Sequence, residues 1–317
     1  MEKAAVEDQG LLIPLIDFSK FLEGDEAQKK ETADAILRGF QTAGFIYLKN
    51  IPVTPETRKH VFDTSAKLFR LPLETKLAHG WTTPEANRGY SAPGREKVTQ
   101  LKDLADVAKL KEGNPDIKES FEIGREGEPD HPNQWPPEEG EMVGFKSTML
   151  DFHDQCKALH VEVMRAIAVG MNLDAGFFDD FVDVGDNTLR LLHYPAVNKE
   201  IFKINPGQDS AGGLQVKSPN GKFVDATPIE NTCVVNAGDL LARWSNDTIK
   251  STIHRVVEPP HKDSDVYPAR YSIAYFCNPN FKSHIEAIPG TFATETEKKY
   301  DGINSGQYLV QRLAATY

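Results

Sequence analysis

Cysteine is scarce in this sequence, and its placement excludes two kinds of site. The 317 residues contain three cysteines, Cys156, Cys233 and Cys277. They are odd in number, far apart and never spaced as Cys-x-x-Cys. The sequence therefore predicts neither a disulfide framework nor a structural zinc site.

Long hydrophobic runs are missing as well. No apolar stretch approaches the roughly 18 residues that a membrane-spanning helix needs. The N-terminal MEKAAVEDQG is acidic and lacks the apolar stretch of a secretory leader. We therefore expect a cytoplasmic protein without a membrane partner.

Basic residues are outnumbered by acidic ones. Lys and Arg number 36 against 47 Asp and Glu, which gives a formal net charge of -11 and a sequence pI of about 5.4. A net-acidic surface with scattered Lys and Arg argues against a nucleic-acid polymer as the partner. The hydrophobic share of 39% and the charged share of 26% are ordinary for a globular protein. We expect a small-molecule substrate and a monomer or weak oligomer.

Two short β-type runs carry the functional prediction. The first covers residues 251–257, the second covers residues 269–277, and a polar link joins them. Residues two apart share a face of a strand. The second run has a bulky face that suits packing against a helix, made of Tyr271, Ile273 and Tyr275. The remaining faces carry Thr252, His254 and Val256 in the first run and Arg270, Ser272, Ala274 and Phe276 in the second.

These side chains suit a dicarboxylate bound to a metal. Arg270 offers a planar, permanently charged fork for the far carboxylate, and Ser272 can donate a second hydrogen bond to the same group. His254 can hold a metal at the near end of the ligand. Taken singly, a core histidine and a surface ion pair are the commoner explanations. The joint presence of all three on strand faces favours a binding site.

The text around these residues resembles a known family. HRVV beginning at His254 and Arg-Tyr-Ser beginning at Arg270, with fifteen residues between the histidine and the arginine, resemble the distal half of the signature of iron(II)/2-oxoglutarate-dependent dioxygenases of the isopenicillin-N-synthase-like branch. The opening of the chain (IPLIDFS, GFIYLKN and FRLPLETK) resembles the N-terminal region of the same family. NTLRLLHYP resembles a family strand whose final tyrosine, here Tyr194, contributes to the 2-oxoglutarate pocket.

The resemblance implies a fold and a set of cofactors. The fold is mainly β with flanking helices, a double-stranded β-helix (jelly roll) core and an N-terminal α/β extension. The implied cofactors are Fe(II) held by His254, 2-oxoglutarate held by Arg270, Ser272 and Tyr194, O2, and ascorbate as a reductant. The expected regions are an N-terminal region over 1–125, a connection with a long bracing helix over 126–184, the jelly roll over 185–290 and a C-terminal helix over 291–317.

The resemblance also indicates the substrate. Phe276 matches a ring that stacks on planar substrates, and Arg190 and Asn87 would bind the carbonyl groups of a flat heterocycle. A buried, inward arginine needs an acidic side chain or a polar substrate as its partner. Within the family, the chain most resembles enzymes that oxidise the methyl group of thymine stepwise to 5-carboxyuracil. The alternatives are a flavonoid-like or secondary-metabolite substrate, and a metal-free, non-catalytic binding relative.

Periodicity predicts the surrounding elements. The long predicted helix carries His153 and His160, which we expect to be exposed or to cap the helix. Residues 213–246 predict consecutive β segments with a hairpin turn at Asn220-Gly221. A strand is expected over residues 45–50, and helices are expected over 26–42, from Pro55 to the residue before Pro72, over 96–114, over 145–171 and over 305–315.

Two of the three metal ligands of this family are missing from the sequence. The family binds iron through two histidines and one carboxylate, and the first two ligands come as His-x-Asp between the Tyr-Pro strand and the GGLQV strand. Here IFKINPGQ runs directly into DSAGGLQV, at Gln208 and Asp209. Either a segment of roughly 15 to 20 residues is absent at this junction, or the protein is a metal-free relative. We favour the first, because loss of an inner strand would open an unpaired edge and empty a core layer.

Overall fold

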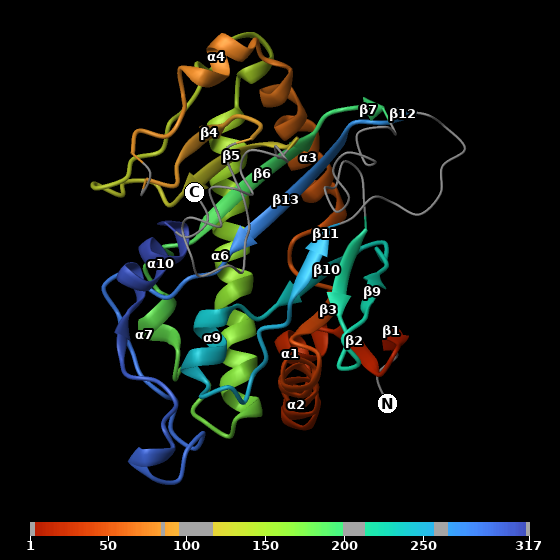
Figure 1. Ribbon diagram of the computed structural model, residues 1–317, viewed down its shortest axis with the longest axis vertical. Helices are drawn as coiled ribbons and strands as arrows, with labels where there is room; N and C mark the ends of the chain where they lie inside the picture. The colour runs from red at the N-terminus through yellow and green to blue at the C-terminus, as the bar shows by residue number, and fades with distance from the viewer. Residues whose placement is uncertain (1–3, 84–85, 95–116, 199–212, 257–265, 315–317) are drawn as a thin grey trace.

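The structure is a computed structural model that describes residues 4–83, 86–94, 117–198, 213–256 and 266–314 (Figure 1). The helix expected over residues 96–114 and the junction between Gln208 and Asp209 lie outside these ranges. The helices described are α1 (Ser19–Glu23), α2 (Glu26–Thr42), α3 (Pro55–Arg70), α4 (Leu73–Leu77), α6 (Phe145–Gly170), α7 (Asp179–Val182), α9 (Asp239–Trp244) and α10 (Ser305–Ala314), with short 3-10 turns at Gly140–Met142 and Glu295–Glu297. The strands are β1 (Ala4–Asp8), β2 (Leu11–Asp17), β3 (Phe45–Lys49), β4 (Gly89–Ser91), β5 (Glu119–Gly124), β6 (Thr188–Tyr194), β7 (Val197–Asn198), β8 (Leu214–Lys217), β9 (Phe223–Ala226), β10 (Thr232–Asn236), β11 (His254–Val256), β12 (Val266–Tyr267), β13 (Arg270–Phe276), β14 (His284–Ile285) and β15 (Ile303–Asn304).

The N-terminal extension is a small sheet with a helix packed on it. The strand order is β1-β2-β3-β10, and β2 runs parallel to β3. Helix α2 begins with a capping box, in which Asp25 accepts from the Gln28 backbone N–H and the Gln28 side chain accepts in return. At Gly39 a Cβ would lie 2.4 Å from Cγ2 of Ile46. Glycine at this position therefore lets α2 approach β3 closely.

The long helix α6 joins two hydrophobic cores. Its first half packs against β5 and β6 through Phe145, Met149 and Phe152. Its second half packs against α2 through Val163 and Ile167. Figure 1 shows α6 running behind the diagonal pair β6 and β13 and continuing to the level of α2. This helix is the bracing helix that the apolar stripe predicts.

The sheet that carries most of the predicted site has the order β13-β6-β5-β4 and is antiparallel throughout. Leu189 and Leu191 of β6 are fully buried against α6. Tyr271, Ile273 and Tyr275 of β13 pack on the same core. The packing face predicted for β13 is confirmed, and β6 has the same division into a packing face and a polar face.

A second sheet, β11-β8-β9, faces the N-terminal sheet. Val216 and Val224 pack against Phe45 and Tyr47 of β3 in one buried cluster. The β8–β9 hairpin turns at the predicted Asn220-Gly221, where Gly221 has φ +79. Two strand layers with helices outside them agree with the predicted mainly β architecture.

Three local predictions are corrected by the structure. Residues 239–244 were expected to continue the β pattern but form α9, because Leu240, Leu241 and Trp244 recur at helical spacing and contact the core around α6. The strand expected over 251–257 is described only from His254 to Val256. His153 and His160 are buried, not exposed or capping.

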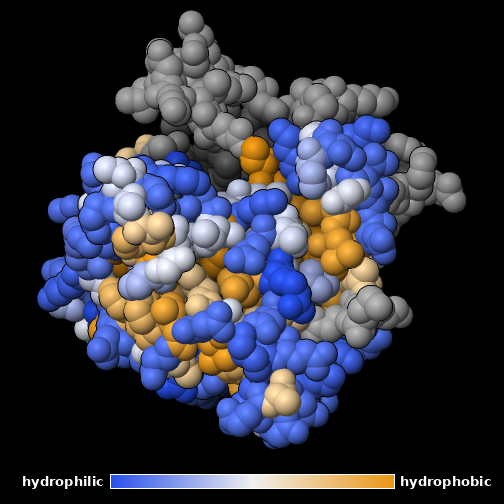
Figure 2. Space-filling model, turned by 90° about the horizontal axis from the view of Figure 1, so that it is seen from below, coloured by the Kyte–Doolittle hydropathy of each residue, from blue (hydrophilic) through white to orange (hydrophobic). Residues whose placement is uncertain are grey.

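In the described ranges no helix combines the length and the apolar character needed to cross a bilayer. Seen from below, hydrophobic surface appears at several places, each bordered by hydrophilic side chains (Figure 2). Scattered apolar surface of this kind is ordinary in globular proteins.

Candidate active site

Five of the seven predicted site residues share one face of two neighbouring strands. The register pairs Arg270 with Tyr194, Ser272 with Leu192, Ala274 with Arg190 and Phe276 with Thr188. Directly opposed residues in an antiparallel pair lie on the same side of the sheet. We call this surface the polar face of β6 and β13, made of Thr188, Arg190, Leu192, Tyr194, Arg270, Ser272, Ala274 and Phe276.

One end of the polar face carries the carboxylate-binding residues. The Arg270 guanidinium lies 5.4 Å from the centroid of the Tyr194 ring, and Ser272 is one row further along β13. Tyr194 is buried, whereas Arg270 and Ser272 are half-buried. A positive fork held on an aromatic ring next to a hydroxyl can bind a carboxylate at a partly open surface.

The other end of the polar face carries a cation and an aromatic ring. The Arg190 guanidinium lies 4.9 Å from the centroid of the Phe276 ring. Phe276 remains 46% exposed. The contact leaves no space for a flat ring between the two side chains, since stacked planes need roughly 3.5 Å on each side. A planar ligand would therefore stack on the exposed side of Phe276.

Arg190 forms an ion pair with an acidic residue that the sequence analysis did not nominate. Its Nε lies 2.9 Å from Oε1 of Glu122, which has no exposed surface. Ser120 Oγ donates to the same carboxylate at 2.7 Å, and Trp81 Nε1 donates to its other oxygen at 2.9 Å. The sequence left two possible partners for Arg190, an acidic side chain or a polar substrate. The structure shows the acidic side chain.

Asn87 reaches the same end of the polar face from the loop before β4. It is buried, and its Nδ2 lies 3.5 Å from Oγ1 of Thr188. Its Oδ1 is buried without a hydrogen-bond partner. An unpaired buried acceptor costs about 1–3 kcal/mol, so an incoming N–H donor would be stabilised here.

His254 lies on the other sheet, on β11, and its ring packs edge-on against Phe45 with centroids 5.3 Å apart. The side chain is exposed. Its Nδ1 lies 3.0 Å from the carbonyl oxygen of Thr252, which accepts a hydrogen bond when Nδ1 carries the proton. That bond leaves the Nε2 lone pair available, as in metal-ligating histidines.

The described ranges do not complete a metal site. No group of three His, Cys, Asp or Glu side chains within them could hold a metal ion. His254 therefore fits as one ligand, and the two other ligands that the family uses have no counterpart among the residues described. The described residues therefore supply one ligand for Fe(II), His254.

The residues missed by sequence reasoning are Glu122, Thr188, Trp81 and Ser120. Glu122 gave a usable signal, because an acidic residue between Phe121 and Ile123 in an apolar strand must be paired when it is buried. Thr188 could have been found because it lies two residues before Arg190 and therefore on the same face of the strand. The loop residue Trp81 gave no signal, since its contact with Glu122 depends on tertiary structure alone.

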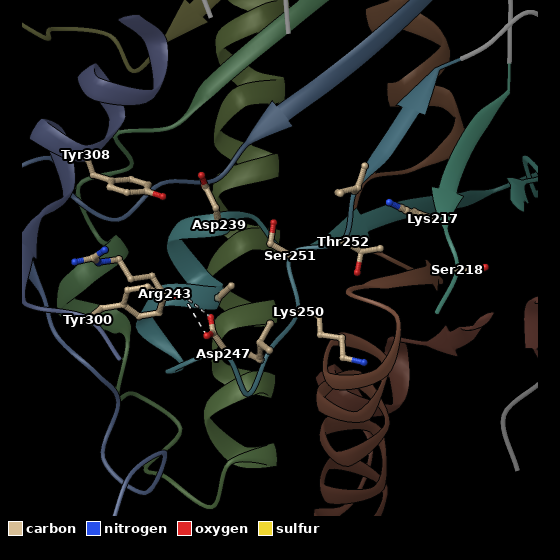
Figure 3. A pocket seen from close by; sticks show the side chains of 13 residues that line it. Lys217, Ser218, Asp239, Arg243, Asp247, Lys250, Ser251, Thr252, Tyr300 and Tyr308 are labelled. Atoms are coloured by element: carbon tan, nitrogen blue, oxygen red, sulfur yellow. Dashed lines mark hydrogen bonds between the residues drawn. The ribbon is translucent and has the colours of Figure 1, made fainter. Parts of the chain in front are cut away.

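A separate cavity of about 540 Å³ lies away from the polar face. Asp239, Arg243 and Tyr300 line one side of it, and Lys217 lines the other (Figure 3). The Arg243 guanidinium lies 4.7 Å from the Tyr300 ring centroid, and Tyr300 donates to Asp247. The cavity contains none of the predicted site residues. We place the site on the polar face because its paired guanidinium, hydroxyl and aromatic groups match a defined ligand chemistry.

Two family models match the chain. The N-terminal model, described as "non-haem dioxygenase in morphine synthesis N-terminal", covers residues 13–138. The second, the 2OG-Fe(II) oxygenase superfamily, covers residues 186–279 and therefore includes β6, β11 and β13. Among curated proteins, the 2-oxoglutarate-Fe(II) type oxidoreductase ppzD of Metarhizium rileyi is 33% identical over 95% of this chain and 90% of its own length.

Solved structures resemble the whole chain. Thymine 7-hydroxylase of Neurospora crassa in complex with alpha-KG and thymine has a TM-score of 0.91 and 73% identity, covering 99% of this chain and 100% of that chain. Its complex with alpha-KG and 5-formyluracil has a TM-score of 0.89 and 70% identity, covering 100% of both chains. The jelly-roll fold predicted from the sequence is confirmed by these similarities.

The curated alignment also bears on the missing ligands. It spans 325 positions although it takes in only 95% of the 317 residues of this chain. The Metarhizium rileyi relative therefore has residues without a counterpart here, in agreement with an absent segment. The junction at which the sequence places that segment lies outside the described residues.

Proposed function

Because the chain belongs to the 2OG-Fe(II) oxygenase superfamily, we propose that it hydroxylates the methyl group of thymine with 2-oxoglutarate and O2 as cosubstrates. Succinate and CO2 are released, and repeated oxidation leads to 5-carboxyuracil. The observation that carries this proposal is the polar face of β6 and β13, which has a carboxylate-binding end and a flat-ring end. The similarity to a hydroxylase whose structure contains thymine supports thymine as the flat-ring substrate.

At the carboxylate-binding end, Arg270 and Ser272 hold the far carboxylate of 2-oxoglutarate. The guanidinium supplies two parallel N–H donors, which a lysine cannot reproduce. The Tyr194 ring, whose centroid lies 5.4 Å from the Arg270 guanidinium, holds that guanidinium in place. The near end of the cosubstrate then points along the polar face toward the small side chain of Ala274, which leaves space between the two ends.

At the flat-ring end, Phe276, Arg190 and Asn87 bind the pyrimidine. The exposed side of Phe276 stacks on the ring, Arg190 supplies donors for a carbonyl oxygen, and Asn87 Oδ1 accepts from a ring N–H. Two residues advance a strand by about 6.6 Å. Phe276 therefore lies about 13 Å along β13 from Ser272, far enough to hold substrate and cosubstrate side by side.

In this superfamily Fe(II) activates O2 for attack on a C–H bond. His254 is the residue that we assign to Fe(II), with its Nδ1 bond to Thr252 as the supporting observation. What the chain contributes elsewhere is binding, orientation and exclusion of water around the methyl group.

The test is turnover of free thymine. Protein supplied with Fe(II), 2-oxoglutarate and ascorbate should convert thymine to hydroxymethyl, formyl and carboxyl products and release succinate. Arg190→Ala should abolish this turnover, whereas Arg38→Ala, an exposed residue of α2, should not change it. Turnover of flavonoid-like or secondary-metabolite substrates in place of thymine would favour a different oxygenase. Absence of iron binding would favour the metal-free binding protein.

A further inference from the structure

Arg88 is a buried cation at the substrate end of the site. It is 2% exposed, and burial lowers its pKa to about 10, an effect opposed by Glu128, Glu122 and Asp186. At neutral pH it is therefore still protonated. In the described ranges no carboxylate forms an ion pair with Arg88, and its Nε has no partner. Burying a charge without an ion-pair partner costs free energy. A buried arginine at this position therefore calls for a functional or structural explanation.

The contacts of Arg88 lead to Asn87. Its Nη1 donates to the backbone carbonyl oxygen of Asn87 at 2.7 Å and to Oγ1 of Thr188 at 3.3 Å. Asn87 itself has φ +47, in the left-handed region that few side chains adopt. The guanidinium thus ties a strained loop residue to the first residue of β6.

Gly124 provides the surface on which Arg88 lies. A Cβ at this position would be 2.1–2.2 Å from the Nη2, Cζ and Nε atoms of Arg88. Gly124 pairs with Thr188 in the register, so the guanidinium occupies the space above the row that ends in Phe276. The φ of Gly124 is not in the left-handed region. Glycine is needed here because Arg88 fills the place of its side chain.

We propose that Arg88 is a positioning residue for the substrate. It fixes the Asn87 loop on β5 and β6, so that the unpaired Oδ1 of Asn87 is held ready for a ring N–H, and Gly124 is the platform that allows this. The proposal rests on the proposed function, since it takes a pyrimidine as the donor. It adds a residue that does not itself touch the ligand.

Gly124→Ala is the sharpest test, because the three atoms nearest to the new methyl group all belong to the guanidinium of Arg88. Thymine affinity is measured by calorimetry in the presence of 2-oxoglutarate, and 2-oxoglutarate affinity is measured separately. We expect Gly124→Ala to weaken thymine binding by about 10- to 100-fold, as misplacement by about 1 Å does. The Kd for 2-oxoglutarate should stay within about twofold, because Arg270 and Ser272 lie several rows away. Gly238→Ala, where a Cβ meets open space, is the matched control.

A double variant separates positioning from general damage. If Gly124 acts through Arg88, then Arg88→Ala and Arg88→Ala with Gly124→Ala should bind thymine equally weakly. Additive losses, or unchanged thymine affinity in Gly124→Ala, would overturn the inference while leaving the proposed function intact. If the unaltered protein neither binds nor oxidises thymine, the proposed function fails, and the inference fails with it.

Discussion

Arg190 and Glu122 stand directly opposite each other on β6 and β5, with Nε 2.9 Å from Oε1. Both side chains are buried, and Glu122 has no exposed surface. Because Trp81 and Ser120 also donate to this carboxylate, Glu122 holds the guanidinium in one orientation over Phe276. The substrate end of the site is therefore preorganised by an anion that need not touch the ligand.

Glu122→Gln should damage both stability and substrate binding. The amide keeps the shape of the side chain but leaves the buried Arg190 charge without its anion, which typically costs about 3–5 kcal/mol. Chemical denaturation should show a loss of this order. Thymine KM should rise more than the 2-oxoglutarate KM. Glu74→Gln, exposed on α4, is the control, and equal stability of the two variants would contradict the assigned role of Glu122.

Arg270→Lys should weaken 2-oxoglutarate binding even though the charge is kept. A lysine ammonium is a point charge and loses the bidentate geometry of the guanidinium. We expect the Kd for 2-oxoglutarate, measured by calorimetry, to rise by about tenfold or more. Arg255→Lys changes an exposed arginine on β11 that stacks on Phe223 and should have little effect. Unchanged cosubstrate affinity in Arg270→Lys would disprove this assignment of the pocket.

The two faces of β6 and β13 could be predicted from the sequence because side-chain alternation is a local property. Every second residue points the same way, so Arg190 and Tyr194, or Arg270 and Ser272, must share a face once the strands exist. Helix α2 was equally predictable, because the helical periodicity of residues 26–42 is also a local property. What alternation alone could not supply was the cross-strand register that puts Arg270 beside Tyr194.

The incorrect predictions concern segments whose structure or burial depends on tertiary contacts. Residues 239–244 form α9 because their apolar side chains pack against the α6 core. In a segment of six residues the hydrophobic pattern is too short to distinguish a helix from a strand. His153 and His160 are buried because α6 is covered on more than one side. The contacts of Arg88 with Gly124 and Thr188 depend on three distant segments and leave no trace in sequence periodicity.

The packing face of the same sheet contains a second buried ion cluster, and Glu119→Gln should destabilise the protein. His193 Nδ1 lies 2.7 Å from one carboxylate oxygen of Glu119, and Lys76 and Tyr90 donate to the other. Burial raises the pKa of Glu119, but these hydrogen bonds outweigh it and hold the pKa below its usual value. The variant leaves the buried Lys76 unpaired, at a cost of about 3–5 kcal/mol.

The matched test for Glu119 is a second substitution. Glu119→Gln combined with Lys76→Met should recover part of the lost stability in denaturant unfolding, because no buried charge remains unpaired. If the double variant is less stable than either single variant, the ion pair is not the source of the effect. Thymine and 2-oxoglutarate affinities of the refolded variants should change little, since His193 and Glu119 face away from the polar face.

His160 should make the protein less stable in mild acid. Burial in α6 lowers the pKa of His160 to about 4, whereas an unfolded histidine titrates near about 6.5. Between these values the unfolded chain binds a proton that the folded chain does not, so the unfolding free energy falls as the pH drops, by at most about 1.4 kcal/mol per pH unit. Above about pH 6.5 both states are neutral, and this contribution no longer varies with pH.

His160→Leu should flatten the dependence of stability on pH. Unfolding free energies measured from pH 7 to pH 5 should decline less steeply in this variant than in the unaltered protein, because the proton-binding difference between the two states is removed. His284→Leu is the control, since the His284 side chain is 59% exposed. His153 also has a pKa lowered by burial, so some acid sensitivity should persist in His160→Leu and decrease further when both helix histidines are replaced. Identical slopes in the unaltered protein and His160→Leu would show that His160 becomes protonated without unfolding.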